Sequence, residues 1–453
     1  MGAAPLATGV LVAAGGAAWE SALLPLLTRP GAPVRLARRC VDVPDLLAAA
    51  AAGRAGLAVV SDQLAGWDVD AVGRLSASGV AALVVVERDT DAERSRRLGV
   101  DALVPAAHAA GPHAIVDRLV TLAARTVADA GLQVDGHQDT GLRDTGLRDT
   151  GPAPTETPGR QHKAGVVAVW GPTGAPGRST VALGVAAAAA GRGIPALLVD
   201  ADVYGGATAP MLAVLDEVSG VLAAARAASA GDLDLPTLAG AARVVAPSLR
   251  VLTGLPRPDR WTALRPPAVR EMLAVARRGG GMVVVDCGFC LEQDEELAFD
   301  SAAPRRNGAT TTILETADVV LVVGSADPLG LSRLARARID LRELVPTAAV
   351  RLVVNRVRTG LGWSRDEVAS TLLQAIGEVP LGFLPLDQEA VDRAWMAGRT
   401  LREAAARSAL TSALDTLAHA VAIELGLAVP AGHRATRGTR RRPRRPAPVT
   451  PRR

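Results

Sequence analysis

The stretch VVAVWGPTGAPGRSTVALGVAAAAAG, residues 166–191, has the composition of a phosphate-binding loop. An apolar run of strand type leads into a turn rich in glycine and proline, and an alanine-rich helix follows. In such loops backbone N–H groups and the helix N-terminus point at the anion, a basic side chain neutralises the terminal phosphates and a hydroxyl binds Mg²⁺. The pattern predicts nucleotide contacts from Gly174, Ala175, Pro176, Gly177, Arg178, Ser179 and Thr180.

Two positions depart from the usual loop. Pro172 stands where the pattern has its first glycine, and Arg178 stands where it has lysine. Arginine keeps the charge, but its planar fork is wider and places its donors differently. Considered alone, the loop is compatible with either a working nucleotide site or a vestigial turn.

Three aspartates at predicted strand ends favour the working site. Asp200 and Asp202 close the strand in ALLVDADVYGG, and Asp286 closes the one in GMVVVDCG. The carboxyl ends of parallel strands face the crevice in which α/β sheets bind ligands. Carboxylates there can hold Mg²⁺ or orient an attacking water. We therefore expect Asp200, Asp202 and Asp286 around a bound Mg²⁺ and its water, with Asp200 and Asp286 as candidate metal-binding residues.

Two α/β patterns must position these residues. Residues 1–128 alternate helical segments with short apolar strands at 9–13, 34–37, 57–60, 82–86 and 102–105, which predicts a doubly wound domain. Residues 163–428 form a second pattern, whose unbroken valine and leucine runs are typical of parallel strands buried on both faces. Its strands are predicted at 165–170, 196–200, 249–254, 281–288, 319–325 and 350–357.

The segments outside these patterns have linker and tail composition. Residues 129–162 contain a tandem D-T-G-L-R repeat and few apolar side chains, which predicts a flexible linker. Residues 429–453 carry nine arginines and no acid, which more than accounts for the net charge of +4. Such a tail can contact nucleic acid or an anionic membrane, or it can be a disordered solubilising extension.

The amino-acid composition indicates how the core is built and which cellular compartment to expect. Aromatic residues make up only 2% of the 453 residues, so the core must consist mainly of alanine, valine and leucine. Three cysteines are too few for a disulfide framework, which favours a reducing compartment. No uncharged stretch has the length of a spanning helix, and we expect a cytoplasmic protein without a transmembrane segment.

The second pattern resembles the MinD/ParA group of P-loop ATPases, whose loop reads K-G-G-x-G-K-T-T. Thr173 falls on the group's signature lysine, Arg178 on its P-loop lysine and Ser179 on its Mg²⁺-binding threonine. The resemblance implies that Asp286 is the Walker B aspartate and that Asp202 orients water. It also implies that Asn355 in VVNRV reads the adenine and that Pro385 lies near the base.

The first pattern resembles response-regulator receivers. Spacing to Ala65 and Gly66 puts Ser61 on the phospho-acceptor position and Asp62 one residue late. The acidic pair and the lysine of receivers are missing as well. The resemblance therefore implies a receiver-like, flavodoxin-like domain that is not phosphorylated and serves docking or dimerisation.

Together the two halves resemble the CpaE/TadZ proteins, and most closely their actinobacterial septum site-determining (Ssd) relatives. This implies an ATP- and Mg²⁺-binding positioning protein that dimerises on ATP, located at a membrane, pole or septum, with division or Tad-type pilus and secretion proteins as partners. Because Thr173 lacks the signature charge, we expect weak hydrolysis. The alternatives are a non-hydrolysing dimeric scaffold and a ParA-like DNA-partitioning ATPase that uses the arginine tail.

Overall fold

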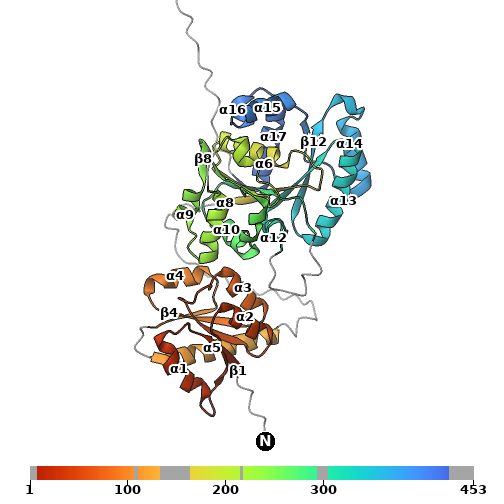
Figure 1. The fold of residues 1–453 in the computed structure, drawn as a ribbon. Helices are drawn as coiled ribbons and strands as arrows, with labels where there is room; N and C mark the ends of the chain where they lie inside the picture. Colours follow the sequence, from red (N-terminus) through yellow and green to blue (C-terminus); the bar gives the residue numbers. More distant parts are fainter. Residues whose placement is uncertain (1–7, 107–110, 133–163, 215–217, 293–304, 428–453) are drawn as a thin grey trace, which may run out of the picture.

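The computed structural model describes residues 8–106, 111–132, 164–214, 218–292 and 305–427, which form two α/β units (Figure 1). The predicted linker and the arginine tail lie outside the described residues, apart from the first four linker residues. These belong to the last helix of the first unit, which runs to Leu132, beyond the predicted boundary at residue 128.

The N-terminal unit is built on a five-stranded parallel sheet with the order β2-β1-β3-β4-β5. This is the strand order of flavodoxin-like folds. The strands are β1 (Thr8–Ala13), β2 (Val34–Arg39), β3 (Leu57–Ser61), β4 (Ala81–Val86) and β5 (Ala102–Pro105). All five predicted strands are therefore present, and the long apolar runs in β3 and β4 are buried throughout, as strands covered on both faces must be.

Helices cover both faces of this sheet. Side chains of α1 (Ala18–Thr28) and α5 (Gly111–Leu132) pack in one apolar cluster, and those of α2 (Val43–Ala51) and α3 (Val69–Ala77) pack in the other. The remaining helix, α4 (Asp89–Arg97), follows β4. Side-chain caps from Asp42 and Asp68 start α2 and α3, so their first turns are fixed locally.

The C-terminal unit is built on an eight-stranded sheet with the order β13-β12-β11-β6-β10-β7-β9-β8. Its strands are β6 (Gly165–Trp170), β7 (Ala196–Ala201), β8 (Arg243–Ala246), β9 (Leu249–Leu252), β10 (Met282–Cys287), β11 (Val319–Ser325), β12 (Ala349–Val357) and β13 (Gly382–Pro385). Only the β8–β9 pair is antiparallel among them. The six predicted strands are present. The short strands β8 and β13 were not predicted, because each has only four residues and most of them are exposed or half-buried.

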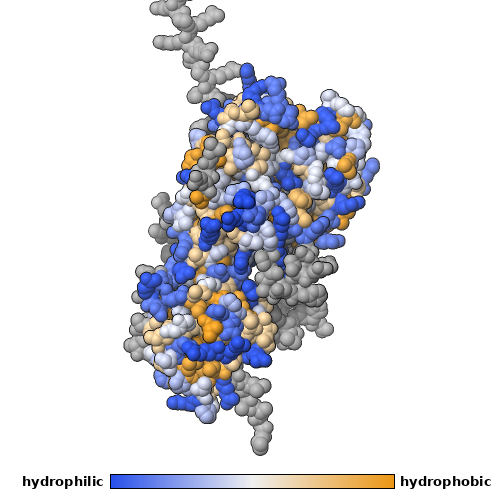
Figure 2. Space-filling view, in the orientation of Figure 1, coloured by the Kyte–Doolittle hydropathy of each residue, from blue (hydrophilic) through white to orange (hydrophobic). Residues whose placement is uncertain are grey.

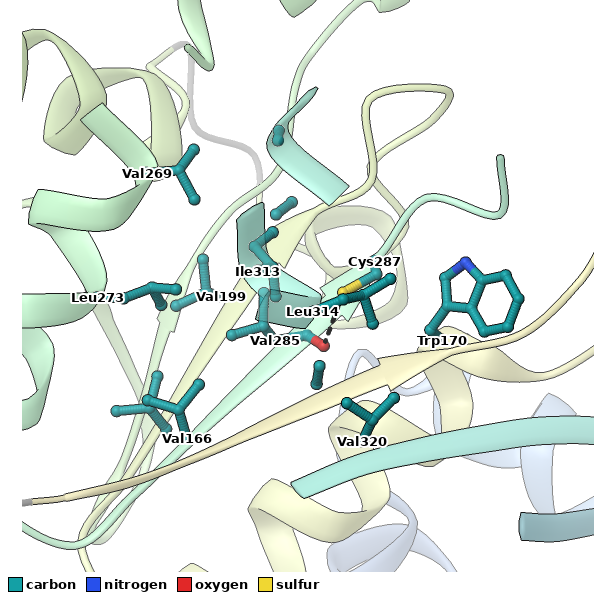
Figure 3. Close-up of a cluster of buried hydrophobic side chains, with 14 of the residues drawn as sticks. Val166, Trp170, Val199, Val269, Leu273, Val285, Cys287, Ile313, Leu314 and Val320 are labelled. Atoms are coloured by element: carbon teal, nitrogen blue, oxygen red, sulfur yellow. Dashed lines mark hydrogen bonds between the residues drawn. The ribbon is translucent and has the colours of Figure 1, made fainter. Parts of the chain in front are cut away.

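Two helical layers enclose this sheet. One contains α8 (Gly220–Ala230), α9 (Leu235–Ala241), α10 (Pro266–Arg278), α12 (Gly308–Thr316), α13 (Pro328–Leu344) and α14 (Arg365–Ile376). The other contains α6 (Arg178–Gly191), α7 (Thr208–Met211), α15 (Gln388–Met396), α16 (Leu401–Ala404) and α17 (Ala409–Glu424). Figure 3 shows the first layer's core, where Leu273 and Ile313 face sheet residues such as Val285.

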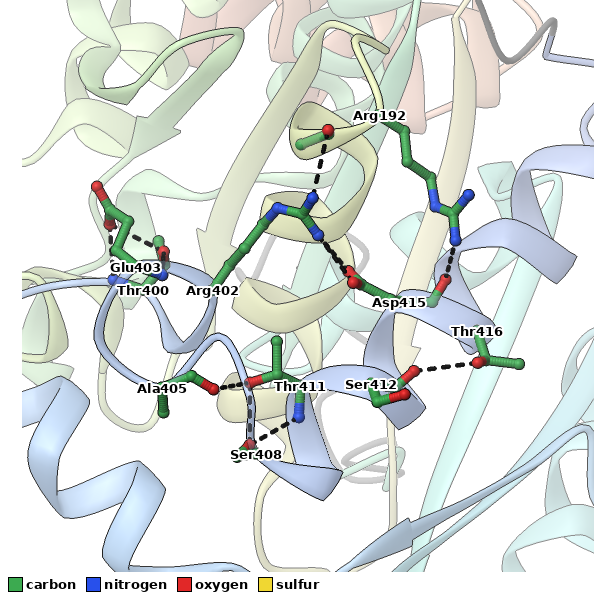
Figure 4. Close-up of polar contacts among 11 residues, drawn as sticks. Arg192, Thr400, Arg402, Glu403, Ala405, Ser408, Thr411, Ser412, Asp415 and Thr416 are labelled. Carbon is green, nitrogen blue, oxygen red and sulfur yellow. Dashed lines mark hydrogen bonds and ion pairs between the residues drawn. The ribbon is translucent and has the colours of Figure 1, made fainter. Parts of the chain in front are cut away.

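The alanine-rich helix α6 is held by α17. Gly184 lets the helices approach, since a Cβ there would lie 2.6 Å from Leu414. At the end of α6, Arg402 donates to the Asp415 carboxylate at 2.7 and 2.8 Å and to the carbonyl of Gly191 at 3.4 Å (Figure 4). A cation at this end also suits the helix dipole. These contacts fix the helix whose N-terminus carries the candidate site.

The two units meet through α3 and α4. Helix α3 packs against α8 and α10, and Arg265 forms a 2.5 Å ion pair with Asp70. Arg94 donates to the carbonyl of Ala230 at 2.7 Å. On the face shown in Figure 2, hydrophilic and hydrophobic residues are interspersed over both units. Within the described ranges, no helix combines the length and apolar character needed to cross a membrane.

The packing of α5 yields a stability prediction. Leu119 is fully buried, whereas its neighbour Val120 is 38% exposed. Leu119→Ala should lower the free energy of unfolding of the N-terminal unit by about 2–5 kcal/mol, because it leaves a cavity. Val120→Ala on the same helix should change it by less than about 1 kcal/mol. Urea unfolding of the full chain measures both, and equal losses would contradict this orientation of α5.

Candidate nucleotide-binding site

The loop between β6 and α6 is confined by its neighbours. A Cβ at Gly171 would lie 2.3 Å from the carbonyl oxygen of Val323 in β11, and one at Gly177 would lie 2.3 Å from the Asn355 amide nitrogen in β12. Gly174 and Gly177 also have φ values of +69° and +95°, which favour glycine. No side chain of the described residues caps α6, so the N–H groups of its first turn remain available to an anion.

A cavity of about 480 Å³ adjoins the loop and the start of α6. It is lined by most of the predicted nucleotide-binding residues, namely Ala175, Pro176, Gly177, Arg178, Ser179, Thr180, Asn355 and Pro385. The volume lies in the range of small-molecule sites. Sequence reasoning missed Arg356, Asp387 and Trp395, which also line the cavity. Gly174 is not among the lining residues and instead contacts Arg333.

Asn355 connects the end of β12 to the loop. Its amide N–H donates to the carbonyl of Pro176 at 2.9 Å, and its amide oxygen accepts from the backbone N–H of Arg356 at 2.9 Å. Arg356 has a φ of +60°, a strained value for a residue with a side chain. Pro385 sits beside this turn because β13 pairs with β12 at Val357. The structure therefore brings Asn355 and Pro385 together at one end of the cavity.

The Arg178 guanidinium is turned toward its own loop. It donates to the carbonyls of Gly171 and Pro172 at 3.3 and 3.4 Å. It also lies 3.8 Å from a carboxylate oxygen of Asp202 and 5.8 Å from the centre of the Phe289 ring. A planar fork can reach these groups simultaneously, which a lysine ammonium does less well. Arg178 therefore braces the loop from within.

Asp286 is a buried carboxylate without a hydrogen-bond partner. It is completely buried, and neither oxygen has a partner among the described residues. Burial raises its pKa well above the usual value, the nearby charge of Asp200 raises it further, and the hydroxyl of Ser179 opposes the shift. No hydrogen bond of standard geometry joins Ser179 to Asp286. An orphaned carboxylate beside a hydroxyl fits a magnesium ion with its bound water, which would satisfy both groups.

Asp200 lies beside Asp286, but its carboxylate already accepts hydrogen bonds. The two are register partners on β7 and β10. One Asp200 oxygen accepts from the backbone N–H and the hydroxyl of Thr208, at 2.9 and 2.8 Å. Burial raises the pKa of Asp200 to about 6. Asp200 thus holds the segment after β7, and the metal-binding role expected for it remains a prediction. Within the described ranges, no three His, Cys, Asp or Glu side chains form a ready-made metal cluster.

Asp202 lies between the loop and a group of aromatic and basic side chains. It accepts from the backbone N–H of Tyr204 at 2.9 Å, and burial raises its pKa although that bond and Arg178 oppose the shift. The Tyr204 ring contacts Phe289 at 4.6 Å between centroids, and Arg306 stacks on it at 4.3 Å. The sequence offered no signal for this group, whose members come from three separate segments.

Comparison with known proteins returns structural neighbours only. The ParA-family ATPase of Chlorobium tepidum has a TM-score of 0.48 and 19% identity, over 57% of this chain and 99% of that one. The cell-division ATPase MinD of Pyrococcus furiosus has a TM-score of 0.46 and 17% identity, over 57% of this chain and 98% of that one. The septum site-determining protein MinD of Pyrococcus horikoshii, complexed with Mg-ADP, has a TM-score of 0.45 and 16% identity, over 57% of this chain and 96% of that one. No family model matches the chain, and no curated protein does. With TM-scores below 0.5, these likenesses assign no function by themselves.

The isolation of Asp286 leads to a prediction about stability. A carboxyl whose pKa is higher in the folded than in the unfolded state favours folding at low pH, and this contribution is lost as the pH rises from about 4 toward the folded value. Asparagine has no carboxyl to ionise, so the Asp286→Asn variant does not lose this stability as the pH rises. It should therefore raise the free energy of unfolding at pH 7 by about 1–3 kcal/mol, with a gain that grows from about pH 4 upward.

Asp200→Asn is the matched control. Donors from Thr208 and from the backbone N–H of Asp202, at 3.4 Å, face the Asp200 oxygens, and a single amide oxygen cannot accept from all of them. This variant should gain less stability than Asp286→Asn, because the lost hydrogen bonds offset the relief of a carboxyl whose own pKa is raised to about 6. Denaturant unfolding between pH 4 and 8 measures both variants. A loss of stability in Asp286→Asn at pH 7 would show that the carboxylate has a stabilising partner.

Proposed function

We propose that this protein binds ATP with Mg²⁺ at the β6–α6 loop and uses the bound nucleotide as a switch for dimerisation and partner binding. The observation that carries the proposal is the orphaned Asp286 carboxylate beside Ser179, at the base of a glycine-confined loop that opens onto a cavity. A buried polar group without a partner costs stability, and a bound ion with its water is one arrangement that would satisfy it.

The roles follow from position. The backbone from Gly174 to Thr180 and the start of α6 would hold the phosphates. Ser179 and Asp286 would hold Mg²⁺, which when bound neutralises phosphate charge. Asp202 would orient the attacking water, and Asn355 with Pro385 would contact the base after Asn355 releases the Pro176 carbonyl. Hydrolysis would be slow because Thr173 provides no signature charge.

The finer role we propose is that of a positioning protein of the CpaE/TadZ or septum site-determining type, cytoplasmic and peripheral at a membrane, pole or septum. The N-terminal unit would act as a receiver-like docking module for division or pilus and secretion proteins. Ser61, at the predicted phospho-acceptor position, ends β3 and is buried. The Asp62 carboxylate is occupied by the Gln63 amide at 3.0 Å and the backbone N–H of Glu87 at 3.3 Å, which fits a module that is not phosphorylated.

A second candidate is a dimeric scaffold that does not hydrolyse ATP. Arg178 and Asn355 both hydrogen-bond to the loop's own carbonyls, so the loop has internal support without a ligand. A ParA-like DNA-partitioning ATPase is the remaining alternative. It would show duplex binding that weakens steeply with salt and is lost on deletion of residues 429–453.

Ser179→Ala tests the magnesium site. Equilibrium titration of the intact protein should give micromolar ATP binding with Mg²⁺ and weaker binding with a chelator. Ser179→Ala should weaken Mg²⁺-dependent binding by roughly tenfold, or about 1.4 kcal/mol, and leave binding in the chelator unchanged. Ser412→Ala, at an exposed position on α17, serves as the control and should match the parent. Absence of saturable binding in the parent would favour the scaffold.

A further inference from the structure

We propose that Arg333 on α13 binds the terminal phosphate of ATP from within the same chain and supplies the charge that Thr173 does not. This inference rests on the proposed nucleotide site and names a residue that the loop motif does not contain. Its basis is a contact. A Cβ added to Gly174 would lie 2.1 Å from the Arg333 Nη1 atom, so the guanidinium rests directly against the loop backbone.

The fold directs Arg333 to this place. Helix α13 follows β11, the neighbour of β6 in the sheet, and so begins at the edge where the loop lies. Its second turn is anchored by the buried Leu334, which packs on Gly324. Side chains on a helix lean toward its N-terminus. The Arg333 side chain therefore extends back toward the carboxyl edge of the sheet and reaches Gly174.

The charge of Arg333 is not used elsewhere in the described part of the chain. Within those residues it has no hydrogen bond or ion pair. By contrast, Arg338 and Arg342 on the same helix both pair with Glu378, at 2.8 and 2.9 Å. Arg336, an exposed residue of α13, also has no such partner among the described residues, so Arg333 is distinguished by its contact with the loop.

Arg356 lines the cavity at the end where Asn355 and Pro385 lie, and two other arginines near the loop are already engaged. Arg178 is held by the loop carbonyls and lies near Asp202. Arg306 is stacked on Tyr204. Thr173 and Gly174 are exposed, and the Arg333 guanidinium lies against this exposed part of the loop. A guanidinium there can donate in a bidentate manner to phosphate oxygens.

The test compares ATP with ADP. Because the contact involves the terminal phosphate, Arg333→Ala should weaken Mg²⁺-ATP binding by about tenfold and change ADP binding by less than about threefold. Arg333→Lys should restore part of the ATP affinity, since it keeps the charge but loses the fork. Arg336→Ala, an exposed neighbour on the same helix, is the matched control and should behave as the parent. Circular dichroism and thermal unfolding verify that each variant is folded.

Each outcome decides the proposal. Selective loss of ATP affinity supports it. An equal loss for ATP and ADP would show that Arg333 only shapes the loop, and unchanged affinities would show that it has no part in binding; either result overturns the inference but leaves the proposed nucleotide site intact. If the parent binds neither nucleotide, the proposed function fails and the inference fails with it.

Discussion

The arrangement of the C-terminal unit depends on the close approach of three neighbours to one loop. The carbonyl of Val323, the Arg333 guanidinium and the Asn355 amide occupy the positions where side chains on Gly171, Gly174 and Gly177 would have to be. These neighbours belong to β11, α13 and β12, which lie on the same side of β6 in the sheet. Strand order therefore determines which groups meet the loop. A larger residue at Gly171 would meet the backbone of β11, whereas one at Gly174 or Gly177 would displace the Arg333 guanidinium or the Asn355 amide.

A second constraint acts on the other side of the loop. Asp286 and Asp200 are adjacent and fully buried, yet among the described residues only Asp200 has hydrogen-bond donors. Burial raises the pKa of both carboxyls, the charge of Asp200 raises that of Asp286 further, and the charge of Asp202 raises that of Asp200. The surrounding core of valine, alanine and leucine tolerates this arrangement because it is extensive on both faces of the sheet. A site that is unfavourable in isolation is what a cation with its bound water would stabilise.

The strands that the sequence predicted are those with long apolar runs, since a parallel strand covered on both faces needs them. The short strands β8 and β13 have no such run. The aspartates were predictable because strand ends in a parallel sheet converge at one edge. The orientation of Arg178 was not, because its partners are backbone carbonyls with no sequence signature. Arg333 and Arg356 were missed for another reason: their roles depend on which helix and turn lie beside the loop.

The replacement of lysine by arginine in the loop has a structural consequence beyond charge. Of the 50 basic residues only Lys163 is a lysine, so every cation near the site is a guanidinium. A guanidinium presents several donors in a plane and readily bonds to carbonyl oxygens. Arg178 donates to the backbone carbonyls of Gly171 and Pro172, which leaves fewer of its N–H donors for a phosphate. Arg333 on α13 lies against Gly174 and has no hydrogen bond or ion pair among the described residues, so its donors remain available at the loop.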